Sequence, residues 1–241
     1  MLYFDKLIII RYKREISIIE SYYNRTIEQF SNIEKEANES ADSFYKNYPL
    51  CEDIDPANVA EMAQEQGLEM YETLNSMKSY HLQMTIAMLY SIWEKQIIKF
   101  TLEELNHYPG TKINGKEIEK INSFLFRQVR EIFKCHGIIF ENLNCWNNLK
   151  ELKLLTNVIK HGEGDSAGGL SKIRPDLFDF GISNNSDLSN IFNADKLNII
   201  KRSNRYILLN KLQESDLCNY IKAVNNFWDE MPSGKVELVT T

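Results

Sequence analysis

The sequence lacks the short motifs that identify several common enzyme classes. It contains no GxGxxG, no GxxxxGKS/T and no HExxH, which argues against dinucleotide-binding enzymes, P-loop NTPases and zinc proteases of that type. Its four cysteines form no CxxC pair, so a disulfide framework or a zinc ribbon is not indicated. Cys135, His136 and Cys145 offer a partial set of metal ligands, but a fourth ligand at short spacing is missing. We therefore expect buried free thiols, no metal and no cofactor.

Residues that interrupt helices are also scarce, with 10 Gly and 5 Pro in 241 residues. A fold of many β-strands needs more turns than these residues supply, whereas long runs rich in Leu, Ile, Glu and Lys favour helices. The apolar N-terminal stretch 1–10 contains Asp5 and Lys6, is too short for a membrane span and has no cleavage site for a signal peptide. We expect an all-α, cytoplasmic protein that does not enter a membrane.

The sequence also has fewer basic than acidic residues. It contains 28 Lys and Arg and 34 Asp and Glu, which gives a net charge of −6. Phosphate binding relies on Lys and Arg, so any contact with a polyanion must be local. Two clusters are candidates, although such clusters are more often solvated surfaces. They are Arg127, Arg130 and Lys134 on one predicted helix, and Lys196, Lys201, Arg202 and Arg205.

Helical periodicity is what the sequence has in abundance. It predicts helices over residues 4–45, 55–106 with a bend near Gly67, 116–135, 143–160, 165–173 and 215–231. Residues 178–195 should form a loop, and a very short strand pair near 190–210 is the one sheet expected. This organisation divides the chain into a long N-terminal helix with its loop (1–54), a helical bundle (55–232) and a flexible tail (233–241).

The second predicted helix carries a methionine-rich face that also includes His81. At helical spacing these methionines serve either as core filler or as an adaptable binding surface, and core filler is the commoner role. We expect His81 to be a hydrogen-bonded histidine in the core or at an interface.

The fourth predicted helix ends in Asn157-Val158-Ile159-Lys160-His161-Gly162. At about 100° per residue, one polar stripe runs along an otherwise apolar helix, formed by Lys150, Lys153, Asn157 and His161, with Lys160 beside it. Lysine and histidine near a helix C-terminus can simply offset the negative end of the helix dipole. Alternatively, His161 exchanges a proton beside cations that bind phosphate.

Two segments resemble the HEPN superfamily (higher eukaryotes and prokaryotes nucleotide-binding). They are Leu89-Tyr90-Ser91-Ile92-Trp93-Glu94, similar to an aromatic-Glu helix, and Leu152–Gly164, in which Asn157-xxx-His161-Gly162 matches the family's polar residue, His and Gly. The segment 174–178 and the last helix, ending Phe227-Trp228, are also similar to a prokaryotic branch. The family's arginine is separated from the histidine by four to six residues, so it would fall at 154–156, where no residue is basic.

The resemblance implies a dimeric helical bundle whose motif helices meet at the subunit interface. It also implies a metal-independent endoribonuclease of a bacterial defence or toxin–antitoxin system, restricted to RNA by its need for the 2′-OH. In that role His161 is the acid or base, Asn157 orients it or the phosphate, and Lys153 or Lys160 supplies positive charge. The alternative is an inactive HEPN-like interaction or regulatory subunit that binds a partner protein, such as an antitoxin.

Overall fold

The computed structural model describes residues 1–49, 55–107, 126–179 and 206–239. The protein is mostly helical, which confirms the all-α fold class. Its main elements are β1 (Leu2–Phe4), α1 (Lys6–Ile27), α2 (Ile33–Asn47), α3 (Pro56–Asn106), α5 (Phe126–Cys135), α6 (Trp146–His161), α7 (Asp165–Ile173), β2 (Phe178–Asp179), β3 (Tyr206–Ile207), α10 (Glu214–Asp229) and β4 (Gly234–Val236).

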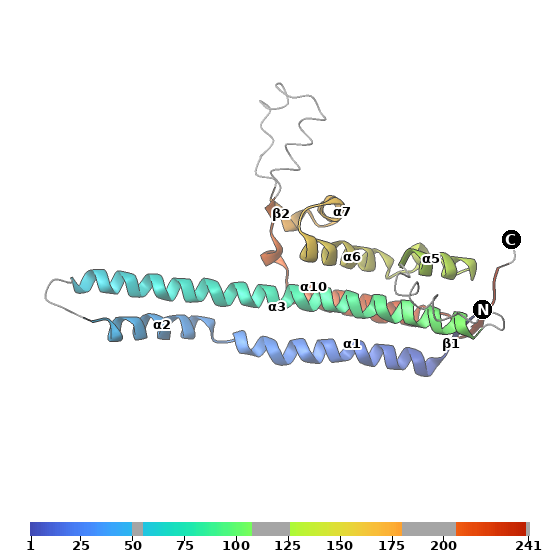
Figure 1. The fold of residues 1–241 in the computed structure, drawn as a ribbon, viewed down its shortest axis with the longest axis horizontal. Helices are drawn as coiled ribbons and strands as arrows, with labels where there is room; N and C mark the ends of the chain where they lie inside the picture. Colours follow the sequence, from blue (N-terminus) through green and yellow to red (C-terminus); the bar gives the residue numbers. More distant parts are fainter. Residues whose placement is uncertain (50–54, 108–125, 180–205, 240–241) are drawn as a thin grey trace, which may run out of the picture.

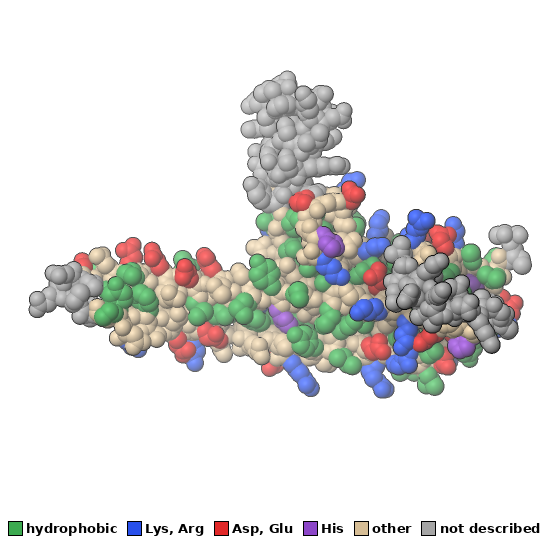
Figure 2. Space-filling view, viewed as in Figure 1, with side chains coloured by type: hydrophobic (Ala, Val, Ile, Leu, Met, Phe, Trp, Pro, Cys, Tyr) green, Lys and Arg blue, Asp and Glu red, His purple; other side chains and the backbone are tan. Residues whose placement is uncertain are grey.

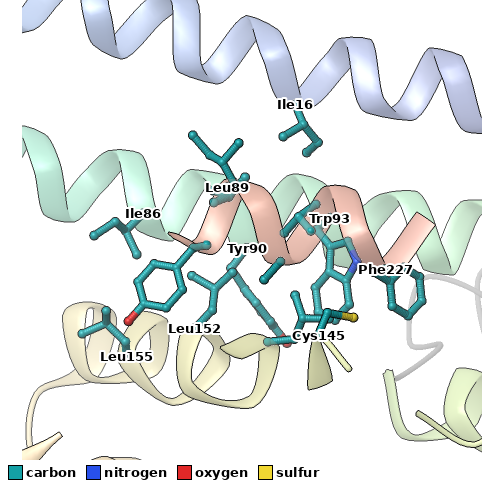
Figure 3. Packing of buried hydrophobic residues seen from close by; sticks show 14 of the residues in the cluster. Ile16, Ile86, Leu89, Tyr90, Trp93, Cys145, Leu152, Leu155 and Phe227 are labelled. Atoms are coloured by element: carbon teal, nitrogen blue, oxygen red, sulfur yellow. The ribbon is translucent and has the colours of Figure 1, made fainter. Parts of the chain in front are cut away.

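The long helix α3 is the scaffold around which the other helices pack (Figure 1). The Asp55 side chain accepts a hydrogen bond from the Ala57 backbone N–H, and Pro56 occupies the first turn, so the helix begins where the sequence predicts. Helices α1 and α2 lie along one side of α3, whereas α5 and α6 lie along the other, and α10 contacts α1, α3 and α6. Close packing of Trp93 with Phe227 (Figure 3), and of Phe100 with Trp228, joins α3 to α10 in the core.

The predicted N-terminal helix over residues 4–45 is divided in the structure. A 3-10 turn at Glu28–Phe30 separates α1 from α2, and Asn32 leaves the helical conformation with φ −119° and ψ 28°. Helix α1 packs against both α3 and α10, whereas α2 packs along the N-terminal part of α3 and forms an arm with it. Periodicity did not predict the break, because both halves keep helical spacing and no Gly or Pro marks it.

Gly67 allows the two helices of this arm to approach each other closely. A Cβ at this position would lie 3.0 Å from the Ala41 Cβ and 3.2 Å from the Ala37 carbonyl oxygen. The predicted bend near Gly67 is wrong, since α3 continues through this residue as one helix. The glycine is instead a helix-packing residue.

The two ends of the described chain meet in a short ladder. Strand β1 pairs antiparallel with β4, so that Leu2 lies opposite Val236 and Phe4 opposite Gly234. Residues 234–236 therefore belong to a sheet, although we expected them in a flexible tail. A second ladder pairs β2 with β3. Its strand Tyr206–Ile207 lies within the expected range 190–210, but its partner Phe178–Asp179 lies in the segment predicted as a loop, the rest of which is outside the described residues.

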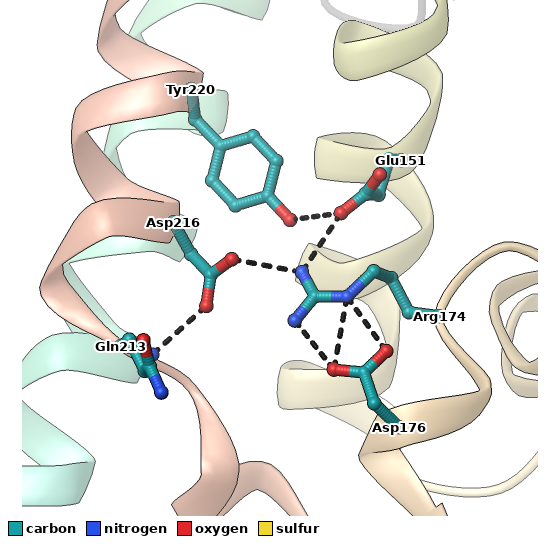
Figure 4. A network of polar contacts seen from close by, with 6 residues as sticks. All are labelled: Glu151, Arg174, Asp176, Gln213, Asp216 and Tyr220. Atoms are coloured by element: carbon teal, nitrogen blue, oxygen red, sulfur yellow. Dashed lines mark hydrogen bonds and ion pairs between the residues drawn. The ribbon is translucent and has the colours of Figure 1, made fainter.

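A network of charged side chains fastens α6 to α10 (Figure 4). The Arg174 guanidinium donates to Glu151 of α6 at 3.1 Å, to Asp216 of α10 at 2.9 Å, and to Asp176. The Tyr220 hydroxyl donates to the same Glu151 carboxylate at 2.6 Å. This network fixes the orientation of α6, the helix that carries the predicted site.

Across the described ranges, no helix combines the length and the apolar character needed to cross a membrane.

Candidate functional site

The C-terminal end of α6 presents His161 to solvent. The Gly162 backbone N–H closes the helix by donating to the Val158 carbonyl oxygen at 2.8 Å. Gly162 has φ +69°, a conformation that favours glycine, and the chain then turns directly into α7. His161 lies on the last turn, as the sequence predicts, and its side chain is exposed.

The side chains of the predicted polar stripe contact three different helices. The Lys160 ammonium donates to the Ser91 hydroxyl of α3 at 3.1 Å, so it lies between α6 and α3 near His161. The Asn157 amide donates to the Ser166 hydroxyl of α7 at 3.1 Å. The Lys153 ammonium lies 5.0 Å from the centre of the Phe126 ring. Lys160 and Asn157 are therefore held by α3 and α7 respectively, and the bonds found for Asn157 within the described ranges do not orient the imidazole.

Residues 154–156, which correspond to the family's arginine, lie on the inner side of α6. Leu155 and Thr156 are fully buried, and Leu154 packs near Gly169 of α7. The Thr156 hydroxyl is itself buried without a hydrogen-bond partner among the residues the structure covers. A cation at 155 or 156 would therefore have to be buried.

Next to the end of α6, the helix α3 bears an exposed apolar stripe. Tyr80 is 63% exposed, Met84 is 67% exposed, and Met77 is exposed as well. With Met88 they fall at three- and four-residue spacing on the helix face that continues to Ser91, the residue bound by Lys160. We call the residues 77, 80, 84, 88 and 91 the α3 stripe. Figure 2 shows hydrophobic side chains gathered over α3 on this face of the molecule.

The exposure of Met77 and Met84 answers the question left open for the methionine-rich face. Core filler, the commoner role, is wrong for these two side chains, whereas an adaptable binding surface agrees with their exposure. His81 behaves as expected, because its Nε2 lies 2.6 Å from the Thr26 hydroxyl and its ring stacks on Tyr23. Burial lowers the pKa of His81.

The expected buried thiols are found only in part. Cys145 is buried, and burial raises the pKa of its thiol to about 12, with a further contribution from Glu230. Cys135 and Cys218 are exposed, because each lies on the outer face of an amphipathic helix, and Cys51 lies outside the described residues. Within the described ranges, no three His, Cys, Asp or Glu side chains form a group that could hold a metal.

Gly164-Asp165-Ser166-Ala167-Gly168 spells GxSxG, a pattern associated with nucleophilic serine. In a nucleophile elbow the serine follows a strand and a sharp turn, whereas here the preceding element is helix α6 and Ser166 lies in the first turn of α7. The Ser166 hydroxyl accepts a hydrogen bond from the Asn157 amide, and among the described residues no histidine is found to accept its proton. The motif therefore does not form a serine hydrolase site in this fold.

The first basic cluster was predicted separately from the lysine stripe, but the structure brings the two together. Arg130 of α5 lines one cavity with Lys150 and Lys153 of α6. The sequence does not reveal that these three cations share a cavity, because they lie on two different helices. The second basic cluster, at 196–205, lies outside the described residues.

Comparison with known proteins finds no matching family model, no matching curated protein and no matching solved structure.

Proposed function

We propose that this chain is a HEPN-like protein, of a bacterial defence or toxin–antitoxin type, that forms a homodimer and acts on RNA with His161. The observation that carries the proposal is the α3 stripe, an exposed apolar surface that leads directly to Lys160 and the exposed His161. An exposed apolar surface rimmed by polar groups is typical of a protein interface.

Dimerisation would complete a site that one protomer supplies only in part. RNA cleavage through the 2′-OH needs one group to accept the hydroxyl proton and another to protonate the leaving 5′ oxygen as the new bond to phosphorus forms. One protomer contributes a single exposed imidazole at the α6 terminus. A twofold interface over the α3 stripe would bring a second His161 and a second Lys160 to the same region.

A second candidate is an inactive HEPN-like interaction subunit that uses the same surface to bind a partner protein. The inward-facing Leu155 and Thr156 favour it, because no arginine fork is available to stabilise charge on a phosphate.

One set of variants tests both candidates. Met84→Glu places a charge in the α3 stripe, whereas Leu68→Glu places the same charge at a residue that is 58% exposed on the opposite face of α3. We expect sedimentation to show that the wild type is a dimer, that Met84→Glu weakens the dimer at least tenfold, and that Leu68→Glu leaves it intact. A wild type that stays monomeric at high concentration would refute the dimer.

Cleavage is measured on the same proteins with a labelled single-stranded RNA and its DNA counterpart. The nuclease proposal expects cleavage of RNA alone, a loss of at least 100-fold in His161→Ala at unchanged thermal stability, and a parallel loss in Met84→Glu. In cells, the wild type but not His161→Ala should slow growth and degrade RNA. No difference between wild type and His161→Ala would refute the nuclease proposal and leave the inactive subunit.

A further inference from the structure

A cavity of about 370 Å³ lies between α3, α5 and α6, toward the N-terminal half of α6. Its volume is near the lower end of the range for small-molecule sites. Trp93, Phe126, Trp146, Leu149 and Leu154 supply apolar walls, and the charged lining residues are Arg130, Glu141, Lys150 and Lys153.

The aromatic walls are held firmly in place. Trp93 is almost fully buried and packs against Phe126 at 5.5 Å and Phe227 at 5.3 Å between ring centres. Figure 3 shows its ring among Tyr90, Cys145 and Phe227. A rigid aromatic wall binds a planar ring at little conformational cost.

The charged groups leave positive charge unmatched. Glu141 forms an ion pair with Arg130, and the described part of the chain contains no ion pair to Lys150 or Lys153. Two of the cations also lie over aromatic rings. Arg130 lies 5.3 Å from the Trp146 ring centre, and Lys153 lies 5.0 Å from that of Phe126. The Arg130 Nε is also buried without a hydrogen-bond partner among the described residues.

We propose that this cavity binds a small anion that carries a planar aromatic ring. The ring packs against the aromatic walls, and the anionic group accepts hydrogen bonds from Lys153 and Lys150 at the rim. Phosphate and carboxylate both satisfy this chemistry, so a mononucleotide and an aromatic carboxylate are the two sources to compare. The site is separate from His161, which lies eight residues, or roughly 12 Å, further along the axis of α6 than Lys153.

Titration calorimetry on the full chain tests the proposal with four probes. The ring-bearing anions are AMP and indole-3-acetate, and the matched fragments are inorganic phosphate and adenosine. We expect at least one ring-bearing anion to bind with a Kd below about 1 mM, at least tenfold more tightly than either fragment, and more weakly as salt is raised. The tighter of the two anions identifies the source. If neither binds, or if phosphate alone binds equally well, the proposal is overturned.

Three variants locate the binding. Lys153→Met should weaken binding of the anion at least tenfold, which is the expected effect of losing one charge-assisted hydrogen bond. Trp146→Leu should weaken the ring-bearing anions but not phosphate. Lys172→Met removes an exposed lysine from α7 that does not line the cavity, and it should change nothing. Equal affinities in Lys153→Met and Lys172→Met, with both variants folded, would place any binding elsewhere and refute the site.

Discussion

Replacing Arg174 with leucine should destabilise the protein by separating α6 from α10. The Arg174 side chain is 19% exposed, and its partners Glu151 and Asp216 are each 16% exposed. Removing one partner from a buried ion pair typically costs about 3–5 kcal/mol, whereas exposed pairs contribute up to about 1 kcal/mol. Because this network is largely but not fully buried, we expect a loss of about 2–4 kcal/mol. For a chain of this size the melting temperature should fall by roughly 5–15 °C.

The loss should also depend on pH. The Arg174 hydrogen bonds lower the pKa of Asp176 below its ordinary value. A lowered folded-state pKa contributes stability that is present above the ordinary carboxyl pKa and is lost as the pH falls through the lowered value. Arg174→Leu removes this contribution. The gap in unfolding free energy between wild type and variant should therefore be largest near neutral pH and narrow as the pH falls below about 4.

Urea unfolding monitored by circular dichroism at several pH values measures both effects, with Lys13→Leu as the matched control. Lys13 also joins two helices through an ion pair, to Asp229, but the two side chains are 35% and 55% exposed. Its loss should cost less than about 1 kcal/mol. Equal losses in Arg174→Leu and Lys13→Leu would refute the view that burial gives the Arg174 network its importance.

Three further substitutions or reactions test the packing. Gly67→Val should destabilise the arm by about 1–3 kcal/mol, because its Cβ would lie 3.0 Å from the Ala41 Cβ; hydrogen exchange in α2 should accelerate, and unchanged exchange would contradict the close approach. The Cys145 thiol, whose pKa is raised to about 12 by burial, should react with iodoacetamide at neutral pH far more slowly than exposed Cys218, as mass spectrometry of labelled peptides can show. Thr156→Val should leave the free energy of unfolding unchanged or raise it by up to about 1 kcal/mol, since the buried hydroxyl has no partner among the described residues. A marked fall in the melting temperature of this variant would reveal a hydrogen bond of Thr156 in solution.

Local signals were sufficient to predict much of the helical framework. Asp55-Pro56 begins α3, Gly162 ends α6, and apolar spacing defines the helices between such signals. These features depend on backbone geometry and on residues three or four positions apart, which the sequence contains directly.

The charge pattern near the site needed the tertiary structure. Lys153 and Lys160 share a polar stripe in sequence, yet one borders an aromatic cavity and the other contacts Ser91 on α3. Helix packing decides which neighbouring helix each residue of a stripe contacts. The periodicity of one helix does not show which helix packs against it.

The sequence by itself determined that this protein is helical and that a histidine lies on the last turn of α6. Only the tertiary structure decided that Leu2 and Val236 share a ladder, that Thr156 faces the core, and that Arg130 joins the lysines of α6 around one cavity. The physical reason is the separation in sequence between the residues that make contact. Helix formation is driven by neighbours in sequence, whereas these arrangements depend on contacts between segments far apart in the chain, whose geometry is set when the whole core packs.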